Sequence, residues 1–209
     1  MYNNMSNYNS KDLKLSINRT LVIIDWDDTL FPSSWAVYNK INLNSESDRI
    51  KYSGEFQKLD FQLSQTINRI SKYGKIIIIT NALLDWIRLT LSVLPKTTKA
   101  LENIDIISAR EKQQNTNPLI LWKTRTFLEV IKNNSGVNNI ISLGDAEYEY
   151  KALINLFNDI TIPHKYLKSV KFIKSNNYQT AIEQIIFIRK EIKEICKKKR
   201  HIDLTFEKA

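Results

Sequence analysis

The sequence TLVIIDWDDTLFPSSW, residues 20–35, runs from an apolar segment directly into a cluster of like charges. Its β-branched start has the continuous apolar pattern of a strand that is buried on both faces of a sheet. Three aspartates, Asp25, Asp27 and Asp28, then lie within four consecutive positions. Carboxylates packed this closely need a cation, a proton or a cationic ligand nearby, or full solvation.

Four more segments have the pattern of a strand, and amphipathic helical patterns separate them. The further strands are expected at residues 75–80, 104–108, 138–144 and 169–173. The helices are expected at residues 55–74, 83–94, 117–134, 147–157 and 178–196. This alternation predicts the α/β class, with a three-layer, Rossmann-like parallel sheet flanked by helices. Ligands of such sheets bind beyond the carboxyl ends of the strands, so we look for chemistry there.

The length of 209 residues and the hydrophobic content of 43% suit one sizeable globular domain. We expect this domain to span residues 13–196. The Asn- and Ser-rich residues 1–12 are expected to form a disordered tail, and residues 197–209 a basic tail.

The net charge of +9 is unevenly distributed, because residues 190–200 alone carry six basic and two acidic side chains. The run KKKR at 197–200 is best explained as a solvated helix end, with a nuclear-import or nucleic-acid patch as the alternative. The chain starts without the apolar core of a signal peptide and has no apolar run of membrane-spanning length. Cys196 is the only cysteine, which excludes an internal disulfide. We expect a cytoplasmic protein with no membrane partner, or a nuclear one if residues 197–200 act as an import signal.

Polar side chains follow the expected strands where ligands would bind. They are Asp25, Asp27, Asp28 and Thr29 after the first strand, Thr80 and Asn81 after the second, Ser108 and Arg110 after the third, and Asp145, Glu147 and Glu149 after the fourth. Lys123, near the start of the helix before the fourth strand, can reach the same edge. Carboxylates are hard ligands for Mg²⁺, and hydroxyl, amide and ammonium groups are donors for phosphoryl oxygens.

These residues form a pattern that resembles the haloacid dehalogenase-like (HAD) superfamily, most of whose members are phosphatases. The similar motifs, in chain order over residues 19–157, are D-x-D-x-T at Asp25 to Thr29, Thr80 after an apolar strand, Lys123, and Gly144-Asp145 with Glu149. The run DWDDTLFPSSW also resembles a group of intracellular HAD-like proteins, which implies no particular substrate.

The resemblance implies a Mg²⁺-dependent phosphatase reaction. Asp25 would be the nucleophile that forms an aspartyl-phosphate, and Asp27 the general acid and base. Thr80 would donate to a phosphoryl oxygen, while Lys123 would neutralise phosphoryl charge and hold Asp25 in place.

The resemblance also implies metal-binding and substrate-binding residues. The metal ligands would be Asp25, Asp27 through its backbone carbonyl, Asp145 and Glu149, with Glu149 acting through water or as a support. The residues expected to contact the substrate are Thr29, Asn81 and Arg110. Lys112 competes with Lys123 for the third motif, because both lie between the third and fourth strands.

Inserted caps often decide which substrates enter enzymes of this superfamily. Residues 30–74 leave room for at most a small helical cap, so we expect a nearly open site. The partner would be a phosphorylated small molecule or macromolecule. Two alternatives remain open: a HAD-like binding or regulatory module without turnover, and a nucleic-acid-end phosphatase recruited by residues 197–200.

Overall fold

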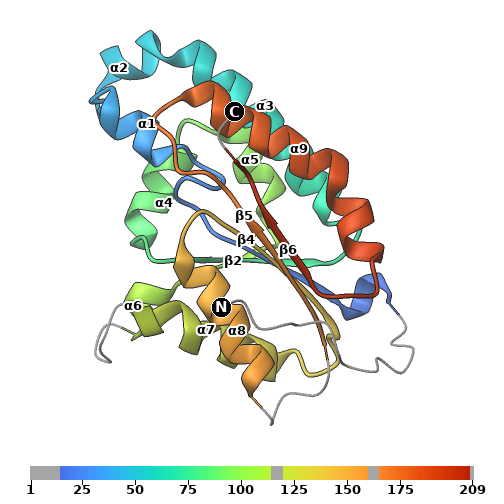
Figure 1. The fold of residues 1–209 in the computed structure, drawn as a ribbon. Coiled ribbons are helices and arrows are strands. Elements are labelled where there is room, and N and C mark those ends of the chain that lie inside the picture. The colour runs from blue at the N-terminus through green and yellow to red at the C-terminus, as the bar shows by residue number, and fades with distance from the viewer. Residues whose placement is uncertain (1–14, 114–119, 160–164, 208–209) are drawn as a thin grey trace.

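The computed structural model describes residues 15–113, 120–159 and 165–207, which contain a six-stranded, all-parallel sheet (Figure 1). Its strands are β1 (Thr20–Ile24), β2 (Lys75–Thr80), β3 (Asp105–Ser108), β4 (Asn139–Gly144), β5 (Tyr166–Lys171) and β6 (Ile202–Thr205). They lie in the order β3-β2-β1-β4-β5-β6. The expected parallel α/β architecture is therefore confirmed, and all the carboxyl ends share one edge of the sheet.

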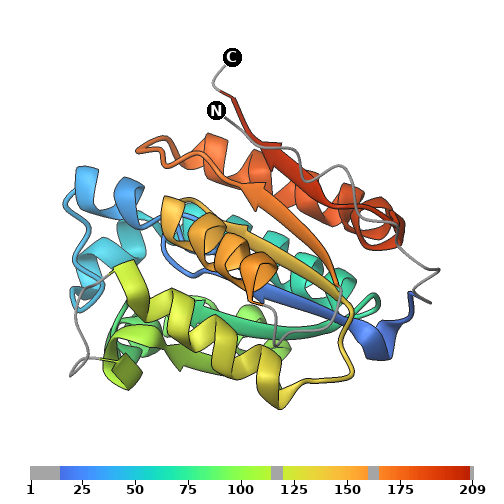
Figure 2. The same ribbon diagram turned by 60° about the horizontal axis from the view of Figure 1, so that its bottom comes forward.

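Helices cover both faces of this sheet (Figure 2). In the described residues they are α1 (Ser33–Tyr38), α2 (Glu46–Lys51), α3 (Ser53–Ile70), α4 (Leu84–Leu91), α5 (Pro95–Ala100), α6 (Ala109–Gln113), α7 (Ile120–Asn133), α8 (Glu147–Asn158) and α9 (Tyr178–Lys197), with a 3₁₀ turn η1 (Ile17–Arg19) before β1. The longest, α3 and α9, lie together on one face, and α7 and α8 lie on the other. Across the described ranges, no helix has both the length and the apolar character needed to cross a bilayer.

The apolar run of β1 is continuous because the strand faces a hydrophobic core on each side. Val22 and Ile24 belong to the core beneath α3 and α9, whereas Leu21 and Ile23 belong to the core beneath α7 and α8. All four side chains are essentially inaccessible to solvent. Burying each stabilises the fold by about 1.5–3 kcal/mol relative to an exposed side chain.

The segment after β1 contains the short helices α1 and α2, and it is anchored to the core. The next helix, α3, packs on one face of the sheet, so only α1 and α2 are inserted between β1 and the helices that cover the sheet. Trp35 of α1 is buried, and its ring centroid lies 5.0 Å from that of Tyr178, 5.7 Å from Tyr52 and 6.0 Å from Phe56. The segment directly after the aspartates is therefore held by packing.

Residues 197–209 were predicted to form a basic tail, but Ile202–Thr205 within them are part of the sheet. Ile202–Thr205 form β6, which pairs in parallel with β5 and shields an edge that would otherwise expose unpaired backbone groups. Lys197 to Arg200 are exposed at the turn between α9 and β6. The expected disorder of residues 1–12 lies outside the described part of the chain.

The fifth strand starts three residues earlier than predicted. The prediction missed its start because a buried lysine, Lys168, interrupts the apolar pattern there. Lys168 is fully inaccessible to solvent, and its Nζ donates to the carbonyl oxygens of Ile195 at 2.7 Å and Cys196 at 3.0 Å. These carbonyls belong to the last turn of α9, which has no intrahelical donors for them. The ammonium thus joins β5 to the end of α9.

Candidate functional site

A buried ion pair lies at the carboxyl edge, directly after β1. The N–H of Asp25 donates to Leu143 O at 2.9 Å, which extends the β1–β4 ladder by one residue. Lys123 of α7 places Nζ 2.7 Å from Asp25 Oδ1, and both side chains are at most 7% exposed. Lys112 instead pairs with Glu129 at 2.6 Å near the surface. Of the two lysines proposed for the third motif, the structure therefore brings Lys123 to Asp25.

Glu149 of α8 completes this buried cluster. Its Oε1 contacts Lys123 Nζ, and its Oε2 accepts the N–H of Ala146 at 3.1 Å, as the glutamate of a capping box does. Gly144, at the end of β4, makes room for this side chain, because a Cβ there would lie 2.6 Å from Glu149 Cδ. The Gly-to-Glu spacing of the fourth motif thus has a steric basis in this fold.

Three carboxylates converge at this edge and could hold a hard divalent cation. Asp25, Asp145 and Glu149 each offer an oxygen, and these oxygens lie within 4.8 Å of one another. Burial, together with the charges of Asp25 and Glu149, raises the pKa of Asp145 to about 8. Burial also raises the pKa of Asp25 to about 6, although Lys123 opposes this. Three acidic groups share one ammonium, so an added cation would relieve their mutual repulsion.

The charge of Lys123 is secured by its two acidic neighbours. Burial alone would lower the pKa of this lysine, but Asp25 and Glu149 raise it above its usual range. The side chain therefore keeps a permanent positive charge beside Asp25 at neutral pH.

Asp27 has a different environment, although it is only two residues from Asp25. Its Oδ1 accepts from Ser33 Oγ and, at 2.8 Å, from the indole Nε1–H of Trp86. Burial raises the pKa of Asp27, the two hydrogen bonds lower it, and the charge of Asp25 raises it further, with a net upward shift. Oδ2 makes no hydrogen bond within the described part of the chain, so it is the oxygen that can carry a proton.

Asp28 is a structural residue of the loop. It adopts the left-handed conformation, with φ of 52°, and its Oδ1 and Oδ2 accept from the backbone N–H and the Oγ of Ser34, each at 2.7 Å. Its own N–H donates to Phe31 O at 2.7 Å. Ser33 and Ser34 therefore fix two neighbouring aspartates in two different ways.

The remaining predicted site residues are not all brought together. Thr80 is buried, and its Oγ1 accepts the N–H of Ala82 at 3.0 Å, which leaves the hydroxyl proton for another acceptor. The buried Thr29 Oγ1 and Asn81 Oδ1 have no hydrogen-bond partner among the residues described. Arg110 is exposed on α6 and, within those same residues, makes neither a hydrogen bond nor an ion pair with the cluster.

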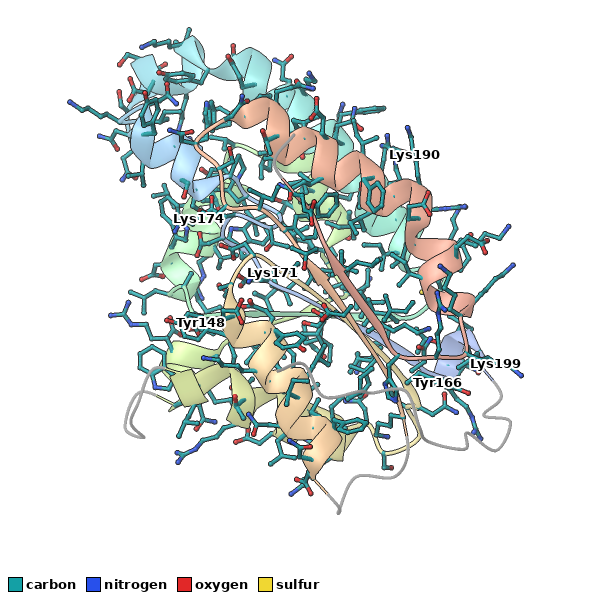
Figure 3. The ribbon with its side chains drawn as sticks, in the orientation of Figure 1. Tyr148, Tyr166, Lys171, Lys174, Lys190 and Lys199 are labelled. Atoms are coloured by element: carbon teal, nitrogen blue, oxygen red, sulfur yellow. The ribbon has the colours of Figure 1, made fainter. Side chains whose placement is uncertain are left out.

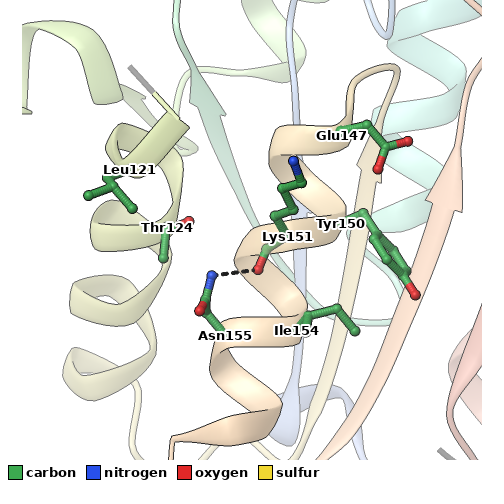
Figure 4. A pocket seen from close by; sticks show the side chains of 7 residues that line it. All are labelled: Leu121, Thr124, Glu147, Tyr150, Lys151, Ile154 and Asn155. Atoms are coloured by element: carbon green, nitrogen blue, oxygen red, sulfur yellow. Dashed lines mark hydrogen bonds between the residues drawn. The ribbon is translucent and has the colours of Figure 1, made fainter. Parts of the chain in front are cut away.

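A separate pocket of about 290 Å³ lies between α7 and α8 (Figure 4). It is lined by Leu121, Thr124, Glu147, Tyr150, Lys151, Ile154 and Asn155. None of the three clustered carboxylates lines it, so this pocket is a neighbour of the site and not its interior.

Sequence reasoning missed the residues that position the aspartates. Ser33 and Ser34 stand six residues after Asp27 and Asp28, within the run first singled out, so this matched spacing was an available signal. Trp86 gave no such signal, because α4 brings it to Asp27 from a distant part of the sequence. No protein-family model, curated protein or solved structure matches the chain.

Proposed function

We propose that the chain is a HAD-like, Mg²⁺-dependent phosphatase that hydrolyses phosphomonoesters through an aspartyl-phosphate on Asp25. The observation that carries this proposal is the buried Lys123 ammonium, 2.7 Å from Asp25 Oδ1, where Asp145 and Glu149 also converge. With a pKa of about 6, Asp25 is mostly ionised at pH 7, as a nucleophile must be.

The acidic cluster fits a magnesium ion by its donor chemistry. Asp25, Asp145 and Glu149 would hold the ion, together with the backbone carbonyl of Asp27. Bound Mg²⁺ would supply charge stabilisation to the phosphoryl oxygens. The excess of buried carboxylates over ammonium groups supports this assignment.

In the first step, a carboxylate oxygen of Asp25 attacks phosphorus, and the bond from phosphorus to the leaving-group oxygen breaks. Asp27 transfers its proton to that oxygen, so the alcohol or phenol leaves neutral. Because Ser33 and Trp86 occupy Oδ1, the proton is carried on Oδ2. Lys123 stabilises the charge on the transferring group.

In the second step, a water molecule attacks phosphorus and gives its proton to Asp27. The bond between phosphorus and the Asp25 oxygen breaks, which releases inorganic phosphate and restores both carboxyl groups. The raised pKa of Asp27 suits a group that must exist in both protonation states during one cycle.

The proposal is tested by hydrolysis of p-nitrophenyl phosphate with and without Mg²⁺. We expect metal-dependent turnover that falls on the order of a thousandfold in Asp25→Asn, which keeps the side-chain shape but removes the nucleophile. Asp203→Asn, at an exposed carboxyl on β6, is the matched control and should retain activity.

An acid quench during turnover should trap phosphate on the peptide that contains Asp25, as detected by mass spectrometry. Full activity in Asp25→Asn would show that the nucleophile lies elsewhere. If wild-type protein neither turns over nor becomes phosphorylated, the site is a binding module and not this phosphatase.

A further inference from the structure

Lys174 lies in the loop between β5 and α9, at the same edge of the sheet as the acidic cluster. The loop begins beside the fourth motif, because the N–H of Phe172 donates to Gly144 O at 2.8 Å. Figure 3 shows Lys174 toward one side of the molecule, whereas Lys199 lies toward the other. Lys174 is thus placed at the rim of the candidate site.

The backbone that presents Lys174 is held by a buried side chain. Gln184 of α9 is only 3% exposed. Its side-chain amide bonds the backbone N–H and C=O of Ile173, the residue before Lys174. Its Oε1 accepts the N–H of Ile173 at 2.6 Å, and its Nε2 donates to Ile173 O at 3.1 Å. The backbone next to Lys174 is therefore held in place beside the site.

The ammonium of Lys174 is available to a further partner. Its Nζ lies 3.7 Å from Asp28 Oδ2, beyond hydrogen-bond distance, and the side chain is 69% exposed. Both oxygens of Asp28 already accept from Ser34 at 2.7 Å, so Asp28 does not depend on this lysine. Among the described residues none accepts a hydrogen bond from Lys174, so its three N–H donors can serve an anion that arrives from solvent.

Other cations at this edge are engaged or more remote. Lys123 lies between Asp25 and Glu149, and Lys171 contacts Glu147. Arg110 is exposed beyond β3 and, within the described residues, has no contact with the loop that carries the aspartates. Because Lys174 lies 3.7 Å from Asp28, its charge is close to the loop that also carries the proposed acid Asp27.

We propose that Lys174 binds a second anionic group of the substrate, so that the site prefers phosphomonoesters whose leaving group carries a carboxylate or a phosphate. This inference rests on the proposed phosphatase function. An anion at this position would otherwise lie beside the carboxyl group of Asp28, and a charge-assisted hydrogen bond to Lys174 offsets that repulsion.

The test compares substrates that differ in charge alone. 4-(Carboxymethyl)phenyl phosphate is matched with its amide, 4-(carbamoylmethyl)phenyl phosphate, and 4-(phosphonomethyl)phenyl phosphate distinguishes a phosphate-type anion from a carboxylate. We expect wild-type kcat/KM to be about tenfold higher for a charged substrate than for the amide, mainly through KM. Lys174→Gln should abolish this preference, and Lys174→Arg should restore it.

Lys190→Gln, at an exposed lysine on α9, is the control and should keep the wild-type preference. The inference is overturned if Lys174→Gln keeps the preference, or if Arg110→Gln removes it instead. Equal Mg²⁺-dependent hydrolysis of all three substrates by wild type would overturn the inference and leave the phosphatase proposal standing. If none is hydrolysed and none phosphorylates Asp25, both proposals fail together.

Discussion

Neighbouring aspartates in one loop have different properties because different partners hold them. Asp27 is half-buried, and no hydrogen bond from a described residue reaches its Oδ2, whereas both oxygens of Asp28 accept from Ser34. Asp25 lies against a permanent cation. The three aspartates thus have three roles: Asp25 is the candidate nucleophile, Asp27 the candidate acid, and Asp28 a residue that holds the loop together.

Gly144→Ala tests the packing of the fourth motif. A Cβ at this position would lie 2.6 Å from Glu149 Cδ, so Glu149 would have to move away from Lys123 and Ala146. We expect the free energy of unfolding to fall by about 2 kcal/mol, as measured by urea denaturation.

Gly54→Ala is the matched control, because a Cβ there meets no atom within 4 Å and the residue is helical. That variant should be about 0.5–1 kcal/mol more stable than wild type. Equal stability of Gly144→Ala and wild type would mean that Glu149 does not need the space above Gly144.

The clustering of Asp25, Asp145 and Glu149 was predictable from the sequence, because they follow adjacent parallel strands. Their approach to Lys123 was predicted less firmly, since spacing alone did not separate it from Lys112. The contact of Trp86 with Asp27 could not be predicted, because it depends on where α4 is placed after β2. Sequence therefore indicates which polar groups share an edge, and tertiary packing decides which of them touch.

At the scale of elements, the contact of β5 with α9 depends on a buried lysine, whose pKa burial lowers to about 8. Between about pH 8 and its ordinary value of 10.5, the unfolded chain holds a proton on Lys168 that the folded chain has lost. The unfolded state thus binds more protons, and the free energy of unfolding rises with pH in this window.

We expect wild type to gain about 1 kcal/mol between pH 8 and pH 9 relative to Lys168→Met, as measured by urea denaturation. Measurements stop at pH 9 because burial raises the pKa of Cys196 to about 11, and ionisation of this thiol in the unfolded chain opposes the gain at higher pH. Parallel pH dependence in the two proteins would show that Lys168 does not titrate differently on folding.

The same lysine explains why the fifth strand was predicted in the wrong place. A charged residue in YLKSVK interrupts the apolar pattern, although its ammonium is satisfied by the carbonyls at the end of α9. β6 was missed because three of its four residues are exposed, so it lacks the pattern of a covered strand. By contrast, β1, β2 and β4 are covered on both faces, and their apolar runs located them closely.

At the scale of the whole molecule, α9 separates the basic run from the candidate site. The helix begins just after Lys174 at the carboxyl edge, and its 20 residues run back along the sheet for about 30 Å. Residues 197–200 precede the start of β6 and so lie at the amino ends of the parallel strands, whereas Asp25 follows the carboxyl end of β1. Figure 3 shows Lys199 of this run far from Lys174. Charges that far apart are screened at physiological ionic strength, where the Debye length is about 8 Å.

Replacing residues 197–200 by glutamine should therefore leave kcat/KM for p-nitrophenyl phosphate within about twofold of wild type. The measurement is steady-state hydrolysis at two salt concentrations. If kcat/KM instead fell tenfold, and fell further at low salt, the charges of residues 197–200 would act on the site from a distance.

The loop of residues 25–34 has a further consequence for how the protein is made. Its internal bonds, from Ser33 to Asp27 and from Ser34 to Asp28, join residues only six apart, whereas its cations come from Lys123 and Lys174. During synthesis the acidic loop emerges well before either lysine. The buried ion pair of Asp25 therefore cannot form until α7 has been made and brings Lys123 to the loop.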